Sequence, residues 1–262
     1  MVAAGVAFTI FTTMAPADVA AWGWRVPFLL GVLIVPIGLW LRSALEETHA
    51  NEDHVKTKNV SSLREAFSQH LGKIISGVGM IIGGTAANAV VVLYMATYAV
   101  TQLKMHPTTG LLAGVVAGLV TFIAAPIGGA ISDRIGRKPV AMAAYGLILV
   151  TIYPAFLYLN AHPTQDVLFA IVAVLALFNA MGGAVIIITL AEVFPVEVRA
   201  TGMSLVYALG VAIFGGFGQF IVTWLIQATG SPIAPAYYVM ACAIATLVAL
   251  RTIPEMKGKV LS

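Results

Sequence analysis

Four charged residues lie close together between two long apolar segments, in the stretch GGAISDRIGRKP that ends at Pro139. They are Asp133, Arg134, Arg137 and Lys138. Such side chains can form ion pairs and can cap helices, because a helix N-terminus attracts carboxylates and a C-terminus attracts cations. Gly136 permits a tight turn. We therefore expect a charged turn between two helices, with Asp133 capping the N-terminus of a neighbouring helix.

A second charged pair, Glu192 and Arg199, flanks Phe194-Pro195 at the end of another apolar segment. Arg134 and Arg137 can pair with Glu192, and such contacts bias a conformational equilibrium if they form in only one of two states. We favour this gating role over a turn that merely retains two helices on one side of a membrane. For Glu192 and Arg199 a solvated helix end remains an equal alternative, because exposed ion pairs contribute only about 0–1 kcal/mol.

Polar side chains inside the apolar segments are candidates for binding a small molecule. The candidates are Asn88, Tyr94, Tyr98, Asn179, Tyr207 and Gln219. The alternative is hydrogen bonding between helices, which is common and contributes about 0.6–2 kcal/mol. For Asn88 and Asn179 the two interpretations are balanced, because a buried amide in lipid must find a partner.

The sequence shows no pattern typical of a metal site, a disulfide or a catalytic nucleophile. The five histidines fall in or beside loops, without the two-His helical spacing of a metal site. The single cysteine, Cys242, allows neither a disulfide nor a CxxC pair. No nucleophile and base recur at a plausible spacing. We expect no enzyme activity, no metal and no cofactor.

The elements that position these residues are membrane helices. Hydrophobic residues make up 60% of the 262 residues, charged residues only 10%, and the mean hydropathy is +0.97. Because about 20 apolar residues span a bilayer core, we predict an all-α polytopic membrane protein. The predicted segments are 24–41, 72–101, 108–131, 139–160, 167–191, 201–227 and 235–253, with a shorter one at 1–15.

The distribution of Lys and Arg predicts the orientation, since these residues are retained on the cytoplasmic side. If the segment from Trp24 ends inside, twelve of the 14 basic residues are cytoplasmic, and only Arg25 and Lys104 lie outside. The N-terminus, the central loop, the charged turn and the C-terminus are then all cytoplasmic. The same distribution explains the pI near 9.0 better than nucleic-acid binding does.

The connections predict four parts of the chain. A polar stretch at 42–71 separates a short part, 1–41, from six helices at 72–253, which precede a tail at 254–262. Within the polar stretch, Ser62-Leu63-Arg64-Glu65 has the spacing of a capping box and predicts a helix start.

The charged turn also carries a family resemblance. Gly129, Asp133, Arg134, Gly136, Arg137 and Lys138 match the GxxxDRxGRK turn of the major facilitator superfamily. Further stretches resemble its metabolite:proton symporter branch: WGWRVPFLLG at 22–31, RSALEET at 42–48, AEVFPVEVRATG at 191–202, VAIFGGFGQ at 211–219 and PAYYVM at 235–240. The resemblance implies a six-helix C-terminal bundle, preceded by the interdomain loop and about one and a half helices of the N-terminal bundle.

Members of that branch carry small carboxylates or zwitterions together with protons by alternating access, and the resemblance implies this function for the full-length protein in the cell inner membrane. Two departures bear on the substrate: family members often have Asn where Ala208 stands and Pro where Gln219 stands. None of the 11 acidic residues lies in the middle of a predicted membrane segment. We therefore expect the proton-binding carboxylate to belong to helices that this sequence lacks.

An alternative is a truncated, non-transporting fragment, or a half-transporter that needs the missing N-terminal helices on the same or another chain. Met1 falls inside an apolar segment, which favours truncation or a misassigned start. The expected partners are the lipid bilayer, a small carboxylate or zwitterionic substrate, protons in the full-length protein and the missing half. We expect residues 1–262 alone to show no proton-dependent uptake.

Overall fold

The computed structural model describes residues 2–32, 34–44, 62–253 and 255. Every regular element in this part of the chain is helical, which confirms the predicted all-α class. Among the described residues, seven helices are long and apolar enough to cross a membrane. They coincide with the seven predicted segments, and their ends differ by at most four residues. The protein is a polytopic membrane protein.

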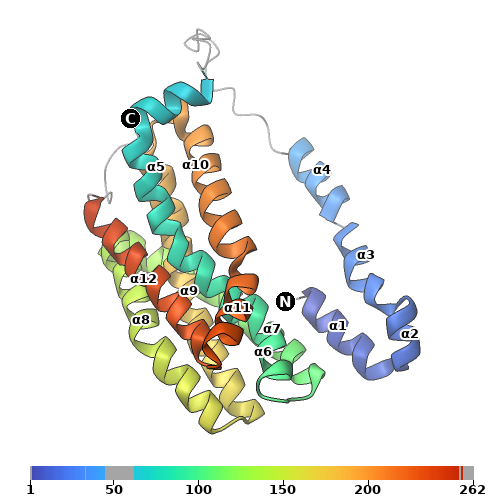
Figure 1. The fold of residues 1–262 in the computed structure, drawn as a ribbon. Helices are drawn as coiled ribbons and strands as arrows, with labels where there is room; N and C mark the ends of the chain where they lie inside the picture. Colours follow the sequence, from blue (N-terminus) through green and yellow to red (C-terminus); the bar gives the residue numbers. More distant parts are fainter. Residues whose placement is uncertain (1, 33, 45–61, 254, 256–262) are drawn as a thin grey trace.

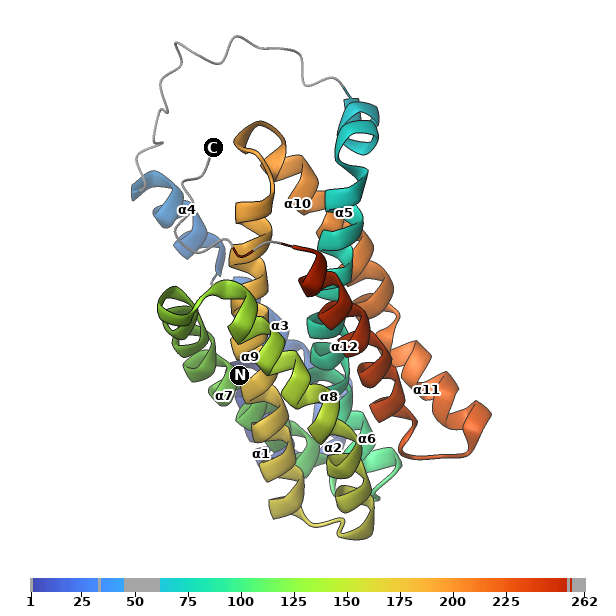
Figure 2. The ribbon, with the colours of Figure 1, turned by 90° about the vertical axis from the view of Figure 1, so that its left-hand side faces the viewer.

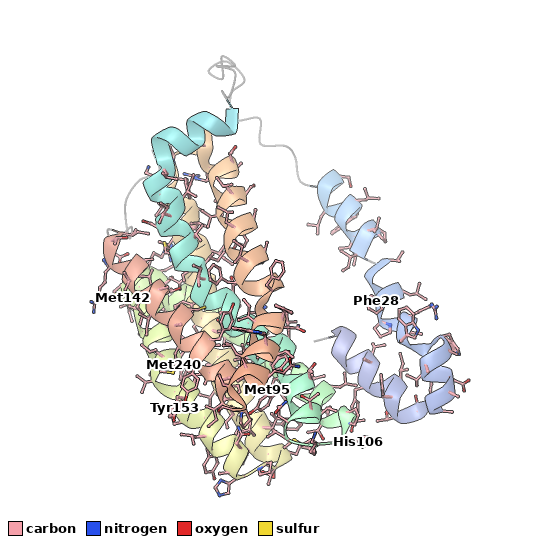
Figure 3. All side chains as sticks on the ribbon, viewed as in Figure 1. Phe28, Met95, His106, Met142, Tyr153 and Met240 are labelled. Atoms are coloured by element: carbon pink, nitrogen blue, oxygen red, sulfur yellow. The ribbon has the colours of Figure 1, made fainter. Side chains whose placement is uncertain are left out.

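Six of these spans form one bundle (Figure 1). Its elements are α5 (Ser62–Ala87), η2 (Asn88–Tyr94), α6 (Met95–Thr101), α7 (Pro107–Ile135), α8 (Arg137–Ala161), α9 (Gln165–Val193), α10 (Val196–Val211), η3 (Ala212–Gly216), α11 (Gly218–Thr229) and α12 (Ala234–Thr252). His106, which precedes α7, lies at one end of the bundle (Figure 3), and Gly136, which follows α7, therefore lies at the other. We call the second of these the Gly136 end.

Two spans of the bundle contain a π-helical stretch. The span Leu71–Thr101 runs through α5, η2 and α6, and the span Val198–Thr229 runs through α10, η3 and α11. A π turn closes i→i+5 hydrogen bonds and is frequent at functional sites. The span Leu71–Thr101 therefore departs from a strict α-helical period over Asn88–Tyr94.

Small residues bring α5 and α12 into close contact, and Figure 2 shows the two helices side by side. A Cβ atom added to Gly79 would lie 2.7 Å from Cβ of Ala249. The buried Thr246 hydroxyl accepts a hydrogen bond from the N–H of Gly83 and donates one to the carbonyl of Gly79, both at 2.8 Å. Small residues thus allow α5 and α12 to approach closely enough for this hydrogen bonding.

The N-terminal part contains five short helical elements. They are α1 (Val2–Thr13), α2 (Pro16–Ala21), η1 (Gly23–Arg25), α3 (Val26–Val32) and α4 (Ile34–Ala44). α1 packs against α7, whereas α3 and α4 extend away from the bundle in Figure 1. Phe28 on α3 is 73% exposed and lies on this separate part (Figure 3).

The predicted interdomain loop lies largely outside the described residues, which resume at Ser62. α5 begins at that residue, where the capping-box pattern predicts a helix start. The helix therefore begins before residue 72, the predicted start of the bundle. Of the predicted tail at 254–262, the structure describes Glu255. The division of the chain into four parts remains a prediction.

Candidate functional site

A cavity of about 300 Å³ opens between α5, η2, α9 and α10. Its polar lining residues are Thr85, Asn88, Tyr145, Asn179 and Tyr207. The rest of its wall is apolar and includes Ile81, Ile186 and Val211. All the polar groups are hydroxyls and amides, so the described wall can bind a ligand by hydrogen bonds without a full charge of its own.

The structure brings three of the six predicted binding residues together at this cavity. Asn88 is contributed by η2, Asn179 by α9 and Tyr207 by α10. These residues are far apart in the sequence, and the packing of the three elements makes them neighbours. The position of Asn88 at the first residue of η2 places a π turn beside the cavity.

The other three predicted residues lie elsewhere. Tyr94 and Tyr98 are buried, and their rings pack 6.2 Å apart. The Tyr98 hydroxyl donates to the carbonyl of Pro232 at 2.8 Å and accepts from Nδ2 of Asn160 at 2.7 Å. Tyr98 thus ties α6 to α8 and to the connection before α12. Gln219 is exposed in the first turn of α11.

Tyr145 lines the cavity although the sequence does not single it out. It lies on α8 among small and apolar residues, and it is completely buried. Two glycines on neighbouring helices face its ring. A Cβ added to Gly84 would lie 2.5 Å from its hydroxyl oxygen, and one added to Gly182 would lie 2.8 Å from Cε2.

Arg137 is the centre of a second cluster, at the Gly136 end. Its guanidinium contacts Ser132 Oγ at 2.7 Å, binds the carboxylate of Asp133 and lies 3.4 Å from Oε1 of Glu192. The Arg137 and Glu192 side chains are only 15% and 19% exposed, whereas that of Asp133 is 64% exposed. One side chain on α8 therefore connects the end of α7 with the end of α9.

The carboxylate that caps α8 belongs to Glu255 and not to Asp133. Its two oxygens accept hydrogen bonds from the backbone N–H groups of Arg137 and Lys138, at 2.9 and 3.0 Å. In return, Nζ of Lys138 donates to the carbonyls of Arg251, in the last turn of α12, and Ile253, its C-cap, at 3.1 and 2.8 Å. The N-terminus of α8 thus receives a negative charge and the C-terminus of α12 a positive one, as the helix dipole favours.

Asp133 cannot serve as this cap because it precedes the turn on α7 and its carboxylate binds the side chain of Arg137. Glu255 was missed because it follows the last apolar segment, in a part of the sequence that reads as a polar tail. The expected pairing with Glu192 is present for Arg137. Arg134 is exposed at the same end.

The remaining predicted residues also lie at the Gly136 end. Gly136 has φ +125°, a conformation that only glycine adopts readily, so it does permit the turn. Gly129 lies one turn before Asp133, and a Cβ added to it would meet nothing within 4 Å. Arg199 donates from Nε to the carbonyl of Phe194 at 3.2 Å, next to the end of α9.

Within the described ranges, no group of three His, Cys, Asp or Glu residues is arranged to hold a metal ion. The chemistry that the structure does offer is hydrogen bonding in the cavity and ion pairing at the Gly136 end.

Comparison with known proteins identifies the family. The profile of the family described as "Sugar (and other) transporter" matches residues 40–262, which is most of the chain. The chain belongs to this family, within the major facilitator superfamily. It is therefore a multi-pass membrane protein of a transporter family and not an enzyme.

Relatives with described activities include a citrate-proton symporter of Klebsiella pneumoniae, 35% identical over 95% of this chain and 56% of the relative. An alpha-ketoglutarate permease of Escherichia coli K12 is 32% identical over 94% of this chain and 56% of the relative. A proline/betaine transporter of the same strain is 26% identical over 98% of this chain and 53% of the relative. The chain thus spans about half the length of these transporters.

Proposed function

We propose that the protein carries a small organic acid or zwitterion across the cell inner membrane by alternating access. The observation that carries the proposal is the cavity of about 300 Å³ between α5, η2, α9 and α10. Its volume is at the lower end of the range of about 300–1,000 Å³ for small-molecule sites. Asn88, Asn179 and Tyr207 are this bundle's contribution to substrate binding.

The contacts of Arg137 form the gate in this proposal. They connect α7, α8 and α9 with Glu255, three residues after α12, at the Gly136 end, which the Lys and Arg distribution predicts to be cytoplasmic. Such contacts stabilise a conformation closed on that side and must break when it opens. The gate comprises Gly129, Asp133, Arg134, Gly136, Arg137, Lys138, Glu192 and Arg199, to which the structure adds Glu255.

Proton coupling requires a second set of helices. All the polar residues of the cavity wall are neutral at pH 7, and the titratable carboxylates of the gate lie outside the wall. We infer that a first half, on the same or another chain, faces the cavity and contributes the proton-binding carboxylate. The names of the relatives support proton-coupled transport of carboxylates and zwitterions.

Uptake into vesicles tests the proposal. Vesicles that contain residues 1–262 with a first half are compared with vesicles that contain residues 1–262 alone, using labelled citrate, 2-oxoglutarate, proline and glycine betaine. We expect saturable uptake of at least one probe in the first case, stimulated by an inward proton gradient, and no gradient-dependent uptake in the second. No uptake in either case argues against transport, and gradient-dependent uptake by residues 1–262 alone would show that coupling lies within them.

A further inference from the structure

Tyr145 reaches the cavity from a helix that contributes no other residue to its wall. The other lining residues belong to α5, η2, α9 and α10, whereas Tyr145 lies on α8, which packs against α9 and α12. The ring passes between Gly84 on α5 and Gly182 on α9, where a Cβ atom would leave no room for it. Both α5 and α9 thus have a glycine at the position where the Tyr145 ring needs space.

The hydroxyl that arrives there has no hydrogen-bond partner among the described residues. Tyr98 is the informative comparison, because it is also completely buried and its hydroxyl has two partners, Asn160 and Pro232. A buried hydroxyl without a partner is costly, and natural structures satisfy nearly all such groups. The ring is therefore packed as a core residue, but its hydroxyl is not used by the described part of the protein.

A second unpartnered atom lines the same cavity. Oδ1 of Asn179 is buried and has no hydrogen-bond partner in the described structure. Both atoms lie near Gly84, since a Cβ added there would be 2.5 Å from the Tyr145 hydroxyl and 3.9 Å from Oδ1 of Asn179. A phenol hydroxyl can donate a hydrogen bond, whereas an amide oxygen can only accept one.

We propose that Tyr145 and Asn179 form a substrate-binding pair that selects a small carboxylate carrying an O–H or N–H donor. The Tyr145 hydroxyl donates to the substrate carboxylate, and Oδ1 of Asn179 accepts from the hydroxyl or ammonium group of the substrate. This inference rests on the proposed transport function and specifies its substrate. Hydroxy acids and amino acids satisfy both atoms, whereas a quaternary ammonium acid or an oxo acid leaves Asn179 without a donor.

The expected selectivity is large because the discriminating atoms are buried. A site built to hydrogen-bond a substrate group rejects analogues that lack it, since its own polar atoms then stay unpaired. Among the probes, citrate and proline carry the required donor and glycine betaine and 2-oxoglutarate do not. We expect citrate or proline to be carried in preference to the other two.

The experiment compares Tyr145→Phe with Tyr98→Phe in the reconstituted transporter. Without substrate, we expect Tyr145→Phe to keep or raise the Tm, because it removes an unpartnered hydroxyl, and Tyr98→Phe to lower it by about 2–4 °C. With substrate, Tyr145→Phe should raise KM for citrate or proline by about tenfold, since a hydrogen bond to a charged group is lost. Tyr98→Phe should leave KM unchanged.

A second pair of variants separates the hydroxyl from the ring. Gly84→Ala keeps the phenol but occupies the place of its hydroxyl, and it should raise KM as Tyr145→Phe does. Gly146→Ala is the control, because Gly146 lies on α8 next to Tyr145, does not line the cavity, and a Cβ there meets nothing within 4 Å.

The outcomes that would overturn the inference differ from the outcome that would overturn the proposed transport function. If Tyr145→Phe lowers the Tm as much as Tyr98→Phe does, the Tyr145 hydroxyl has a structural role and the inference is overturned. An unchanged KM in Tyr145→Phe also overturns it. Preference of the unmodified protein for glycine betaine or 2-oxoglutarate overturns the donor requirement while leaving transport intact. If the unmodified protein neither carries nor binds any of the four probes, the proposed function fails and the inference fails with it.

Discussion

The carboxylate of Glu255 accepts a hydrogen bond of 2.9 Å from the backbone N–H of Arg137, 118 residues earlier in the chain. Glu255, which follows the end of α12 by three residues, thereby holds the first turn of α8. Because Lys138 in turn donates to two carbonyls at the C-terminal end of α12, the two helices are joined by a carboxylate at the N-terminus of α8 and an ammonium group at the C-terminus of α12.

We predict that Glu255→Gln weakens closure at the Gly136 end. A charge at a helix N-terminus contributes about 0.3–1 kcal/mol when exposed and up to ~2 kcal/mol when partly buried. Labelling of Ala184→Cys in the cavity wall, in a Cys242→Ser background, should therefore be about two- to tenfold faster from that side. The control is Asp166→Asn, in the first turn of α9 at the other end of the bundle. Equal labelling rates in the two variants would remove Glu255 from the gate.

Asp133→Asn should slow transport without unfolding the protein. The carboxylate binds Arg137 but is 64% exposed, so its contribution to stability is expected to stay within about 1 kcal/mol. Uptake rate and Tm are measured on the same preparation. An unchanged rate together with unchanged labelling from the Gly136 side would assign Asp133 a purely topological role.

The pair Arg137 and Glu192 should be energetically coupled. Arg137→Gln leaves the partly buried Glu192 carboxylate, whose Oε2 already has no hydrogen-bond partner in the described structure, without its cation. We expect each single neutralisation to cost about 1–3 kcal/mol and the double variant Arg137→Gln/Glu192→Gln to cost less than their sum, by about 0.5–3 kcal/mol. The free energy of unfolding of all four proteins measures the coupling, and strict additivity would contradict it.

Gly136→Ala should destabilise the turn by about 1–3 kcal/mol. The backbone at Gly136 has φ +125°, where a side chain is strained, and its Cβ would come within 3.0 Å of Oε2 of Glu255. Gly129→Ala, inside the preceding helix α7, is the control, because a Cβ there has open space around it and the backbone is helical. Thermal unfolding of both variants distinguishes them, and equal Tm values would contradict the predicted strain.

Thr246→Val should lower stability by about 1–3 kcal/mol at nearly constant volume. The substitution removes a hydroxyl that bonds to Gly79 and Gly83 across the contact between α5 and α12. Thr223→Val on α11 is the comparison, because the Thr223 hydroxyl is exposed and bonds within its own helix. Unfolding measurements should show a loss only for Thr246→Val.

The membrane spans could be predicted from the sequence because each is a long apolar run bounded by polar residues, and a bilayer requires such a run to form a helix. The charged turn was equally readable, since its glycine and its charges lie within one short stretch. The hydrophobic pattern could not show that the helix changes from α to π at Asn88. The π turn at Asn88 alters the direction of every later side chain on that span, and Tyr94 and Tyr98 point into the bundle core.

The two residues that the sequence does not reveal, Tyr145 and Glu255, were hidden for different reasons. Tyr145 functions through space left by glycines on two other helices, and this depends on how three helices pack. Glu255 lies in a polar tail, where a carboxylate has no visible partner until α8 and α12 are placed side by side. The roles of both residues depend on tertiary contacts, which the local sequence pattern does not show.

The π-helical stretch η2 also determines how the span Leu71–Thr101 would respond to the deletion of one residue. η2 and η3 lie against each other in the bundle, and each holds one residue more than an α turn would. Deleting one residue from η2 would restore a regular α-helix but rotate everything beyond it by about 100°, because an α-helix has about 3.6 residues per turn. Tyr98 would then lose Pro232 and Asn160. A one-residue deletion in η2 therefore changes the direction of every later side chain on this span.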